Sequence, residues 1–144
     1  MKNLIILEDE SERERAMANA LSDLEGFKPL FFDNAAQLIE WLKAHLPECT
    51  LISLDHDLGR VKPLEGVLVK PGTGWDVVEY LVTQPPTFPV ILHSANREAV
   101  VGMKTALEKA KWNCRVVTPY PPDLDWVSKD WYRAVRMFLS LRKG

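Results

Sequence analysis

Short apolar runs alternate along the chain with longer stretches of helical periodicity. Five of the runs are brief, rich in apolar residues and followed by polar or turn-forming residues, which is typical of buried strands. They cover residues 3–7, 28–32, 50–54, 90–92 and 115–117. The stretches between and after them repeat apolar residues every three or four positions and predict helices. These helices are the one that begins at Ser11 and ends at Gly26, the one that Asn34 caps and Pro47 stops, and residues 74–84, 96–111 and 127–141.

This order of elements predicts an α/β fold. Five successive strand-and-helix units favour a single five-stranded parallel sheet with helices on both faces, the (βα)5 flavodoxin-like arrangement, because right-handed crossovers place helices on each side. In open parallel sheets, ligands bind beyond the carboxyl ends of the strands. We therefore expect the functional residues to follow the strands directly.

Composition is that of an ordinary folded protein. The length suits one domain over residues 1–144, and 47% hydrophobic and 26% charged residues with a net charge of -2 argue against disorder and against a polyanion-binding bias. No run of about 18 apolar residues occurs, and the acidic start is unlike a signal peptide. We expect a cytoplasmic protein with no membrane attachment and no DNA-binding output domain. Cys49 and Cys114 are expected to be reduced core thiols.

Polar residues follow most of the predicted strands directly. They are Glu8, Asp9 and Glu10 after the first strand, Asp55, His56 and Asp57 after the third, His93, Ser94 and Asn96 after the fourth, and Thr118 after the fifth. Two acidic clusters at neighbouring strand ends repel each other unless a cation or a proton intervenes. Mg²⁺, or Mn²⁺, is the expected cofactor, with a phosphate taking a remaining position. The open alternative is that the acids, above all Glu10 and Glu12, are solvated residues that the helix dipole favours.

The motifs at these strand ends resemble a bacterial response-regulator receiver domain over nearly the whole chain. They are ILEDE, LISLDHDLG, TGWDVVEYL, ILHSA and VVTPY, in chain order. The resemblance implies that Glu8 and Asp9 hold the metal, that Asp57 adds its backbone carbonyl, that Asp55 accepts a phosphoryl group, that Ser94 is the switch hydroxyl, and that Gly74 starts the third helix. We expect Asp9 and Asp55 to lie across from each other at the carboxyl end of the sheet, with Glu8 alongside.

Two departures from the receiver pattern bear on function. Receivers end the fifth strand with a lysine and a proline, and the lysine contacts the phosphoryl group, whereas here Thr118 precedes Pro119. The second departure is a long insertion at about 60–72, whose alternation around Glu65 and Gly66 predicts a small hairpin. Two interpretations of the insertion stay open: a solvated loop, or a cationic lid over the site formed by Arg60, Lys62 and Lys70.

Histidines follow both central strands, which ordinary receivers do not require. A single histidine at a strand end is usually structural, but His56 and His93 together beside carboxylates favour general acid–base chemistry. LDHDLG and HSAN also resemble a divergent receiver-like branch named for processing cyclic phosphates and found in phage and bacterial conflict systems. The candidate catalytic residues are Asp55, His56, His93 and Ser94, the candidate phosphate-binding residues are Ser94, Asn96, Arg97 and Thr118, and the candidate metal ligands are Glu8, Asp9, Asp55 and Asp57.

Three functions are compatible with these residues. The first is a degenerate stand-alone receiver-like domain whose divalent-metal and phosphate site acts in phosphate-linked signalling or processing. The second is a metal-assisted phosphoesterase for cyclic-phosphate or phosphodiester substrates, and the third is a non-catalytic protein-interaction module. The expected partners are a phosphate-containing small molecule or an RNA end, and another protein. Fold alone does not choose among these functions, so whether the chain is an enzyme stays open.

Overall fold

Five parallel strands form the central sheet, in the order β2-β1-β3-β6-β7. The computed structural model describes residues 2–59, 62–120 and 122–141. The strands are β1 (Lys2–Leu7), β2 (Phe27–Phe32), β3 (Cys49–Leu54), β6 (Val90–Leu92) and β7 (Cys114–Val116). Each lies within one or two residues of the predicted run. The sheet order places β1, β3 and β6 side by side, so the residues that follow these three strands meet at one edge.

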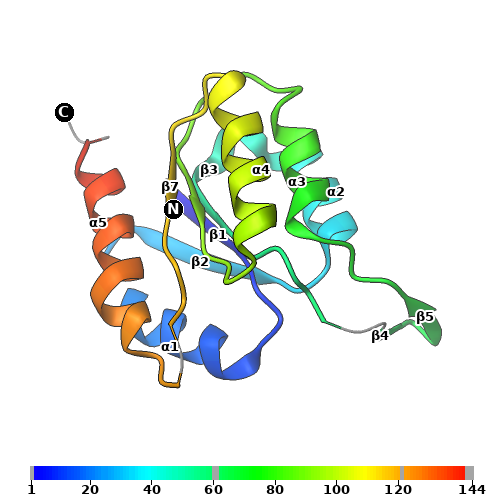
Figure 1. Ribbon diagram of the computed structural model, residues 1–144, viewed down its shortest axis with the longest axis horizontal. Coiled ribbons are helices and arrows are strands. Elements are labelled where there is room, and N and C mark those ends of the chain that lie inside the picture. The colour runs from blue at the N-terminus through cyan, green and yellow to red at the C-terminus, as the bar shows by residue number, and fades with distance from the viewer. Residues whose placement is uncertain (1, 60–61, 121, 142–144) are drawn as a thin grey trace.

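Helices cover both faces of the sheet, as predicted (Figure 1). They are α1 (Ser11–Leu21), α2 (Ala35–His45), the short 3-10 helix η1 (Leu46–Glu48), α3 (Gly74–Leu81), α4 (Arg97–Lys109), the π-helical turn η2 (Val127–Trp131) and α5 (Tyr132–Leu141). α1 and α5 lie on one face, and α2, α3 and α4 lie on the other. Over the described ranges, no helix is long and apolar enough to cross a membrane.

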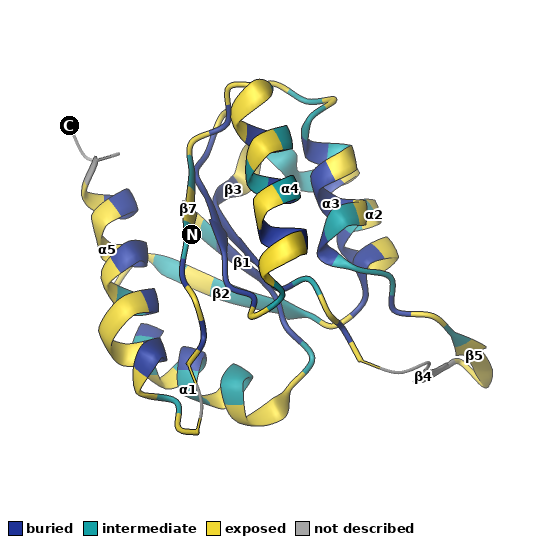
Figure 2. Ribbon diagram, viewed as in Figure 1, coloured by how far each residue is buried: buried dark blue, intermediate teal, exposed yellow. Residues whose placement is uncertain are grey.

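The core has two halves, one on each face of the sheet, and the buried residues lie on the central strands and on the sides of the helices that face them (Figure 2). On β3, Ile52 and Leu54 pack towards α2, α3 and α4, whereas Leu51 packs towards α1 and α5. This alternation follows from the two-residue period of a strand. Both cysteines are free, as expected, with Cys49 buried and Cys114 half-buried. Burial raises the pKa of each thiol to about 12, so both stay protonated at neutral pH.

Helix starts agree with the sequence better than helix ends do. Asn34 caps α2 as expected, and Asn96, predicted as the first residue of its helix, caps α4; each accepts a backbone N–H three residues on. α1 ends at Leu21 rather than near Gly26, and at its C-cap both the backbone N–H and the hydroxyl of Ser22 donate to the carbonyl of Asn19, the hydroxyl at 2.7 Å. The predicted C-terminal helix opens as the π-helical turn η2 before it becomes α5.

The insertion after β3 contains the predicted hairpin. β4 (Lys62–Leu64) pairs antiparallel with β5 (Val67–Val69), and Glu65 and Gly66 form the turn with φ of 53° and 81°. Positive φ at both turn residues fits the tight turn that best matches strand twist. The hairpin projects from the body of the molecule beyond α3 (Figure 1), and Leu68 near its tip is 74% exposed. Arg60, one of the three predicted lid cations, lies outside the described residues.

Candidate metal and phosphate site

Three buried side chains from neighbouring strands converge at the carboxyl edge of the sheet. Glu8 follows β1, Asp55 follows β3 and His93 follows β6, and one ligand atom from each lies within 4.8 Å of the others. The exposed fraction of each residue is 5% or less. The sequence predicted Glu8 and Asp55 as metal ligands, but His93 only as a catalytic residue. Two carboxylates and an imidazole form a donor set that suits a divalent cation.

Glu8 is the best-satisfied member of this cluster. Its Oε2 atom accepts the backbone N–H groups of Asp9 and Glu10, both at 3.0 Å, and its Oε1 atom lies 3.1 Å from Nε2 of His93. Burial raises the pKa of Glu8, but the hydrogen bond and charge of His93, the Glu10 N–H and Arg13 together outweigh it. The net shift is downward, so Glu8 stays ionised at neutral pH.

His93 belongs to a line of buried hydrogen bonds that runs into the core. Its Nδ1 atom lies 2.6 Å from Oγ of Ser53, which accepts the indole N–H of Trp131 at 2.8 Å. Every member is paired when Ser53 donates to Nδ1 and Nε2 donates to Glu8. A second placement, in which Nδ1 donates to Ser53, would leave the Nε2 lone pair facing Glu8 and therefore requires a metal ion between them. The second placement is the usual way in which a neighbouring acceptor orients a metal-binding histidine.

Asp55, the third member of the cluster, also packs against the start of α3. Its Oδ1 atom accepts the backbone N–H of His56 at 2.7 Å. Gly74 packs directly on the Asp55 carbonyl, and a Cβ atom at position 74 would overlap that oxygen. Burial raises the pKa of Asp55 to about 6, with His93 opposing the shift and Glu8 adding to it. A nearby positive charge therefore strongly stabilises the ionised form of this carboxylate.

Arg13 supplies such a charge, a role that was not predicted from the sequence. An Nη1 atom of Arg13 lies 3.7 Å from Oδ2 of Asp55 and 3.8 Å from Oε1 of Glu8. Its guanidinium stacks over the ring of Trp126, 5.3 Å from the ring centroid. A signal existed in the sequence, because Arg13 stands four and eight residues before the buried Met17 and Leu21 and so shares their inward face of α1.

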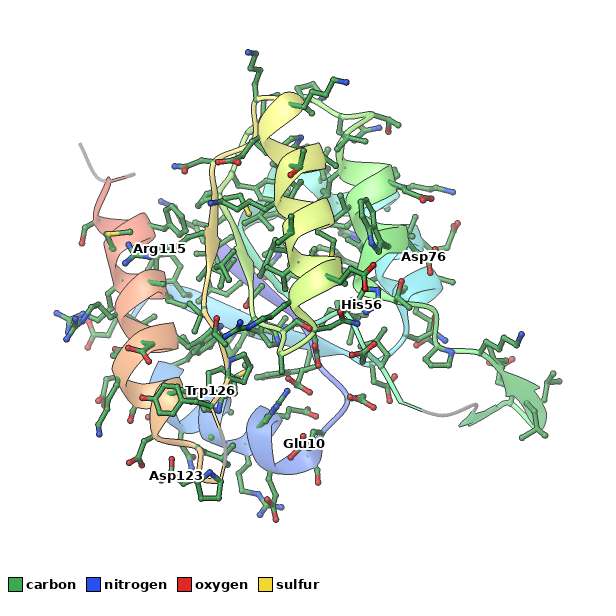
Figure 3. The ribbon with its side chains drawn as sticks, in the orientation of Figure 1. Glu10, His56, Asp76, Arg115, Asp123 and Trp126 are labelled. Atoms are coloured by element: carbon green, nitrogen blue, oxygen red, sulfur yellow. The ribbon has the colours of Figure 1, made fainter. Side chains whose placement is uncertain are left out.

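The second histidine lies at the mouth of the site. Nδ1 of His56 is 2.9 Å from Oδ1 of Asp57 and 3.4 Å from Nδ2 of Asn96. The Asp57 side chain is 65% exposed, and its backbone bridges to Thr73. Trp126 lies on the α1 and α5 side of this edge and His56 on the α3 and α4 side (Figure 3). His56 is therefore the imidazole at the opening, whereas His93 is enclosed.

The other predicted metal ligands are arranged around the buried cluster rather than in it. Asp9 is half-buried, and its carboxylate covers Gly59, where a Cβ atom would lie 2.5 Å from Oδ2 of Asp9. Asp57 directs its carboxylate to His56. Among the described residues, the group with converging ligand atoms consists of Glu8, Asp55 and His93. A metal role for Asp9 and for the Asp57 carbonyl stays a prediction.

The predicted phosphate-binding residues differ in how far they are buried. Ser94 is buried, and its Oγ atom accepts the backbone N–H of Asn96 at 3.1 Å, at the start of α4. Arg97 and Thr118 are exposed, and so is Lys70 of the predicted lid. The side chain of Lys62 lies outside what the structure describes. Among the described residues, the cation that contacts Asp55 is Arg13, on the α1 side of the edge.

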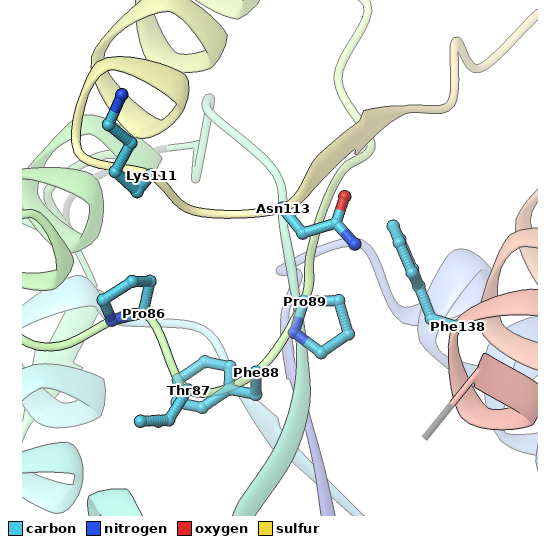
Figure 4. Close-up of a pocket in the computed structure, with 7 residues that line it drawn as sticks. All are labelled: Pro86, Thr87, Phe88, Pro89, Lys111, Asn113 and Phe138. Carbon is cyan, nitrogen blue, oxygen red and sulfur yellow. The ribbon is translucent and has the colours of Figure 1, made fainter. Parts of the chain in front are cut away.

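A cavity at the opposite end of the sheet is separate from these residues (Figure 4). It is open to solvent and has a volume of about 210 Å³. Its lining comes from the loop before β6, the segment before β7, and Phe138 of α5. These segments precede their strands, so the cavity lies at the amino edge, where open parallel sheets do not usually bind ligands.

Comparison with known proteins agrees with the geometry. The parallel sheet and its acidic carboxyl edge define a receiver-like domain. The family described as the cyclic-phosphate processing receiver domain matches residues 4–109, and the chain belongs to that family. No curated protein matches the chain.

Solved structures of response regulators share the fold. The phosphorylated cyanobacterial phytochrome response regulator RcpA is 17% identical with a TM-score of 0.73, and the match covers 97% of this chain and 95% of RcpA. The Mn²⁺-bound response regulator Rcp1 is 16% identical with a TM-score of 0.67, covering 96% and 94%. A signal receiver domain from Pseudomonas fluorescens Pf-5 is 15% identical with a TM-score of 0.69, covering 99% and 97%. At these identities the likeness shows the fold.

Proposed function

We propose that this receiver domain binds a divalent cation and a phosphate-bearing ligand at the carboxyl edge of its sheet, and acts in phosphate-linked signalling or processing. The observation that carries the proposal is the convergence of Glu8, Asp55 and His93 within 4.8 Å in a buried position. Two buried carboxylates so close together are costly without positive charge. Rcp1, which shares the fold, has a Mn²⁺-bound form, and this supports a divalent cation here.

The residues present fit a divalent cation. Carboxylate oxygens from Glu8 and Asp55 and the Nε2 atom of His93 would hold it, and the imidazole favours Mn²⁺ or a similar ion over Mg²⁺, which prefers oxygen ligands. When bound, the cation would neutralise both carboxylates and polarise a phosphate oxygen. Ser53 would fix the imidazole by accepting its Nδ1 proton, and Ser94 would offer its hydroxyl to the phosphate.

Calorimetric titration with Mn²⁺ and Mg²⁺ tests the site. We expect Mn²⁺ to bind the wild type, and Asp55→Asn to weaken binding tenfold or more because it removes a buried negative ligand. Asp57→Asn is the matched control, since that carboxylate is exposed and contacts His56. We expect its affinity to stay within about twofold of the wild type. A wild type that binds neither metal, or an Asp55→Asn variant that binds as the wild type does, would refute the proposal.

Durable phosphorylation of Asp55 is not part of the proposed function. Thr118 is exposed and uncharged where receivers have the lysine that contacts the phosphoryl group. We expect slow, short-lived or no modification with acetyl phosphate, as measured by intact mass over time. A stable adduct on most of the protein would show instead that the domain works as an ordinary phosphorylated switch.

A second candidate function is hydrolysis of a cyclic phosphate or another phosphodiester. Two observations favour it: His56 lies at the mouth beside Asn96, and the family is named for cyclic-phosphate processing. In this reaction water attacks phosphorus, one P–O ester bond breaks, and the leaving oxygen takes a proton. His56 is placed to act as acid or base, whereas both nitrogens of His93 have partners in the core.

Kinetics on a panel of 2′,3′-cyclic nucleotides with Mn²⁺ would test this candidate. His56→Ala is expected to lower the rate by about 10²- to 10⁴-fold, the usual contribution of a positioned acid or base, with metal affinity retained. His93→Ala is expected to lose metal affinity as well. If the wild type binds the metal and turns over no substrate, the second candidate fails and the binding function remains.

A further inference from the structure

The positive charge beside Asp55 comes from a different element than in receivers. In the receiver pattern it belongs to a lysine after the last strand, and that position is Thr118 here, which is exposed. In this structure the cation 3.7 Å from Oδ2 of Asp55 is Arg13, which α1 carries on its inward face. The positive charge at this edge of the sheet therefore comes from α1, near the start of the chain, and not from the segment that follows the last strand.

Arg13 contacts three carboxylates and an aromatic ring, but its contacts with the carboxylates are longer than good hydrogen bonds. Its distances to Glu8, Glu10 and Asp55 lie between 3.4 and 3.8 Å, longer than the 2.7–2.9 Å of a charge-assisted hydrogen bond. The Trp126 ring fixes one face of the guanidinium, and 20% of the Arg13 side chain is exposed. A guanidinium has five N–H donors in a planar fork that matches the oxygens of a phosphate. The group is therefore positioned at the site with donors to offer an anion.

We propose that Arg13 is the phosphate-binding cation of this site, in place of the lysine that the sequence lacks. The inference rests on the proposed phosphate site and assigns the residue that recognises the anion. Because a guanidinium can engage two phosphate oxygens at once, it is suited to a phosphoester oxyanion as well as to inorganic phosphate. Arg13 also approaches both buried carboxylates, so the same guanidinium would offset the negative charge of the anion and of the two acids.

The test uses beryllofluoride, a phosphoryl mimic, with Mn²⁺, and inorganic phosphate with Mn²⁺ as a second probe. Binding is followed by tryptophan fluorescence, since Trp126 lies against Arg13. We expect Arg13→Gln to weaken binding about 10- to 100-fold, the loss of a hydrogen bond to a charged group. Arg13→Lys should retain part of the affinity. Arg15→Gln, an equal charge change at an exposed position of α1, is the control and should stay within about twofold.

A rescue separates recognition from structure. Thr118→Lys in the Arg13→Gln background restores the lysine of receivers, and we expect it to recover most of the lost affinity for beryllofluoride and phosphate. Mn²⁺ titration and thermal unfolding confirm that each variant folds. Equal binding by the wild type and a folded Arg13→Gln would overturn the role of Arg13 and leave the phosphate site intact. A wild type that binds Mn²⁺ but neither probe would overturn the phosphate site itself, and the role of Arg13 with it.

Discussion

The two faces of the sheet differ most at its carboxyl edge. On the face covered by α2, α3 and α4, the strands stay apolar to their last residues, Leu7, Leu54 and Leu92. On the face covered by α1 and α5, the apolar series of each strand continues into polar residues, which are Glu8 after β1, Ser53 and Asp55 on and after β3, and His93 after β6. On the first face the strand residues belong to the apolar core up to the end of each strand. On the second face, the residue two positions after the last apolar one already belongs to the candidate site.

This difference shows how the fold supports buried charge. The polar residues lie on the face where two tryptophans of the last helical segment cover them: Trp131 donates to Ser53, and Trp126 stacks on Arg13 and on the ring of His93. A buried polar group costs stability unless it is paired. The line from Trp131 to Glu8 pairs each member in turn, so the site is built into the core rather than placed on surface loops.

The largest expected effect compares neighbours on β3 that face opposite ways. Ile52→Ala should lower the free energy of unfolding by about 2–5 kcal/mol through the cavity it leaves, with little change in metal affinity. Ser53→Ala should cost about 1–3 kcal/mol, because it leaves buried polar groups unpaired, and should weaken metal binding about 10- to 100-fold. Urea unfolding and Mn²⁺ titration measure both. Equal metal affinity in the two variants would contradict the division between the faces.

A second prediction concerns the ionisation of Asp55. Its pKa is about 6 in the folded protein, above the value of about 3.9 in an unfolded chain, so the folded state binds the proton more tightly. Without metal, the wild type should therefore lose up to about 3 kcal/mol of stability as pH rises from about 4 to 6. Asp55→Asn should lack this loss and be more stable than the wild type at pH 7.

Thermal unfolding between pH 4 and 8 with a chelator measures the effect, and Asp57→Asn, which alters an exposed carboxylate, serves as control. Excess Mn²⁺ should reverse the order of wild type and Asp55→Asn, because the cation favours the ionised carboxylate. Glu8 acts in the opposite direction: its pKa is lowered, so its contribution is present above about 4.5 and is lost in more acidic solution. If Asp55→Asn showed the same decline from pH 4 to 6, another group would be responsible.

Trp131→Phe tests the far end of the hydrogen-bonded line. The substitution keeps an aromatic ring in the core but removes the N–H that Ser53 accepts. We expect a loss of about 1 kcal/mol, typical of one hydrogen bond, and a several-fold weaker affinity for Mn²⁺ as His93 becomes less well oriented. Trp112→Phe, in the opposite half of the core, is the matched control and should leave metal affinity unchanged.

The smallest effect is expected at the projecting hairpin. Val67→Ser and Leu68→Ser alter residues that are 62% and 74% exposed, and surface changes of this kind usually stay within about 0.5 kcal/mol. Metal affinity should also be unchanged, because these side chains lie on the hairpin and not on the α1 and α5 face. A clear loss of Mn²⁺ or beryllofluoride binding in either variant would place the hairpin over the site and revive the lid interpretation.

Sequence periodicity alone determined the strands, the helices and which residues reach the carboxyl edge. An apolar run predicts a buried strand from local sequence alone. Because residues two apart on a strand share a face, Ser53 and Asp55 could be assigned to one side of the sheet from the sequence. The same rule places Ile91 and His93 together. Receiver-like motifs then indicated Glu8 and Asp55 as neighbours, and the structure brings them together.

Tertiary structure decided which partners those residues have. Ser53 and Trp131 are 78 residues apart, Glu8 and His93 are 85 apart, and their hydrogen bonds depend on how the last helical segment and β6 pack on the sheet. The cation also depended on packing, because helical periodicity places Arg13 on the inward face of α1 but only the packing of α1 on the sheet brings it to Asp55. Short-range periodicity fixes the direction of a side chain, but the pairing of buried charges is settled by contacts between distant elements.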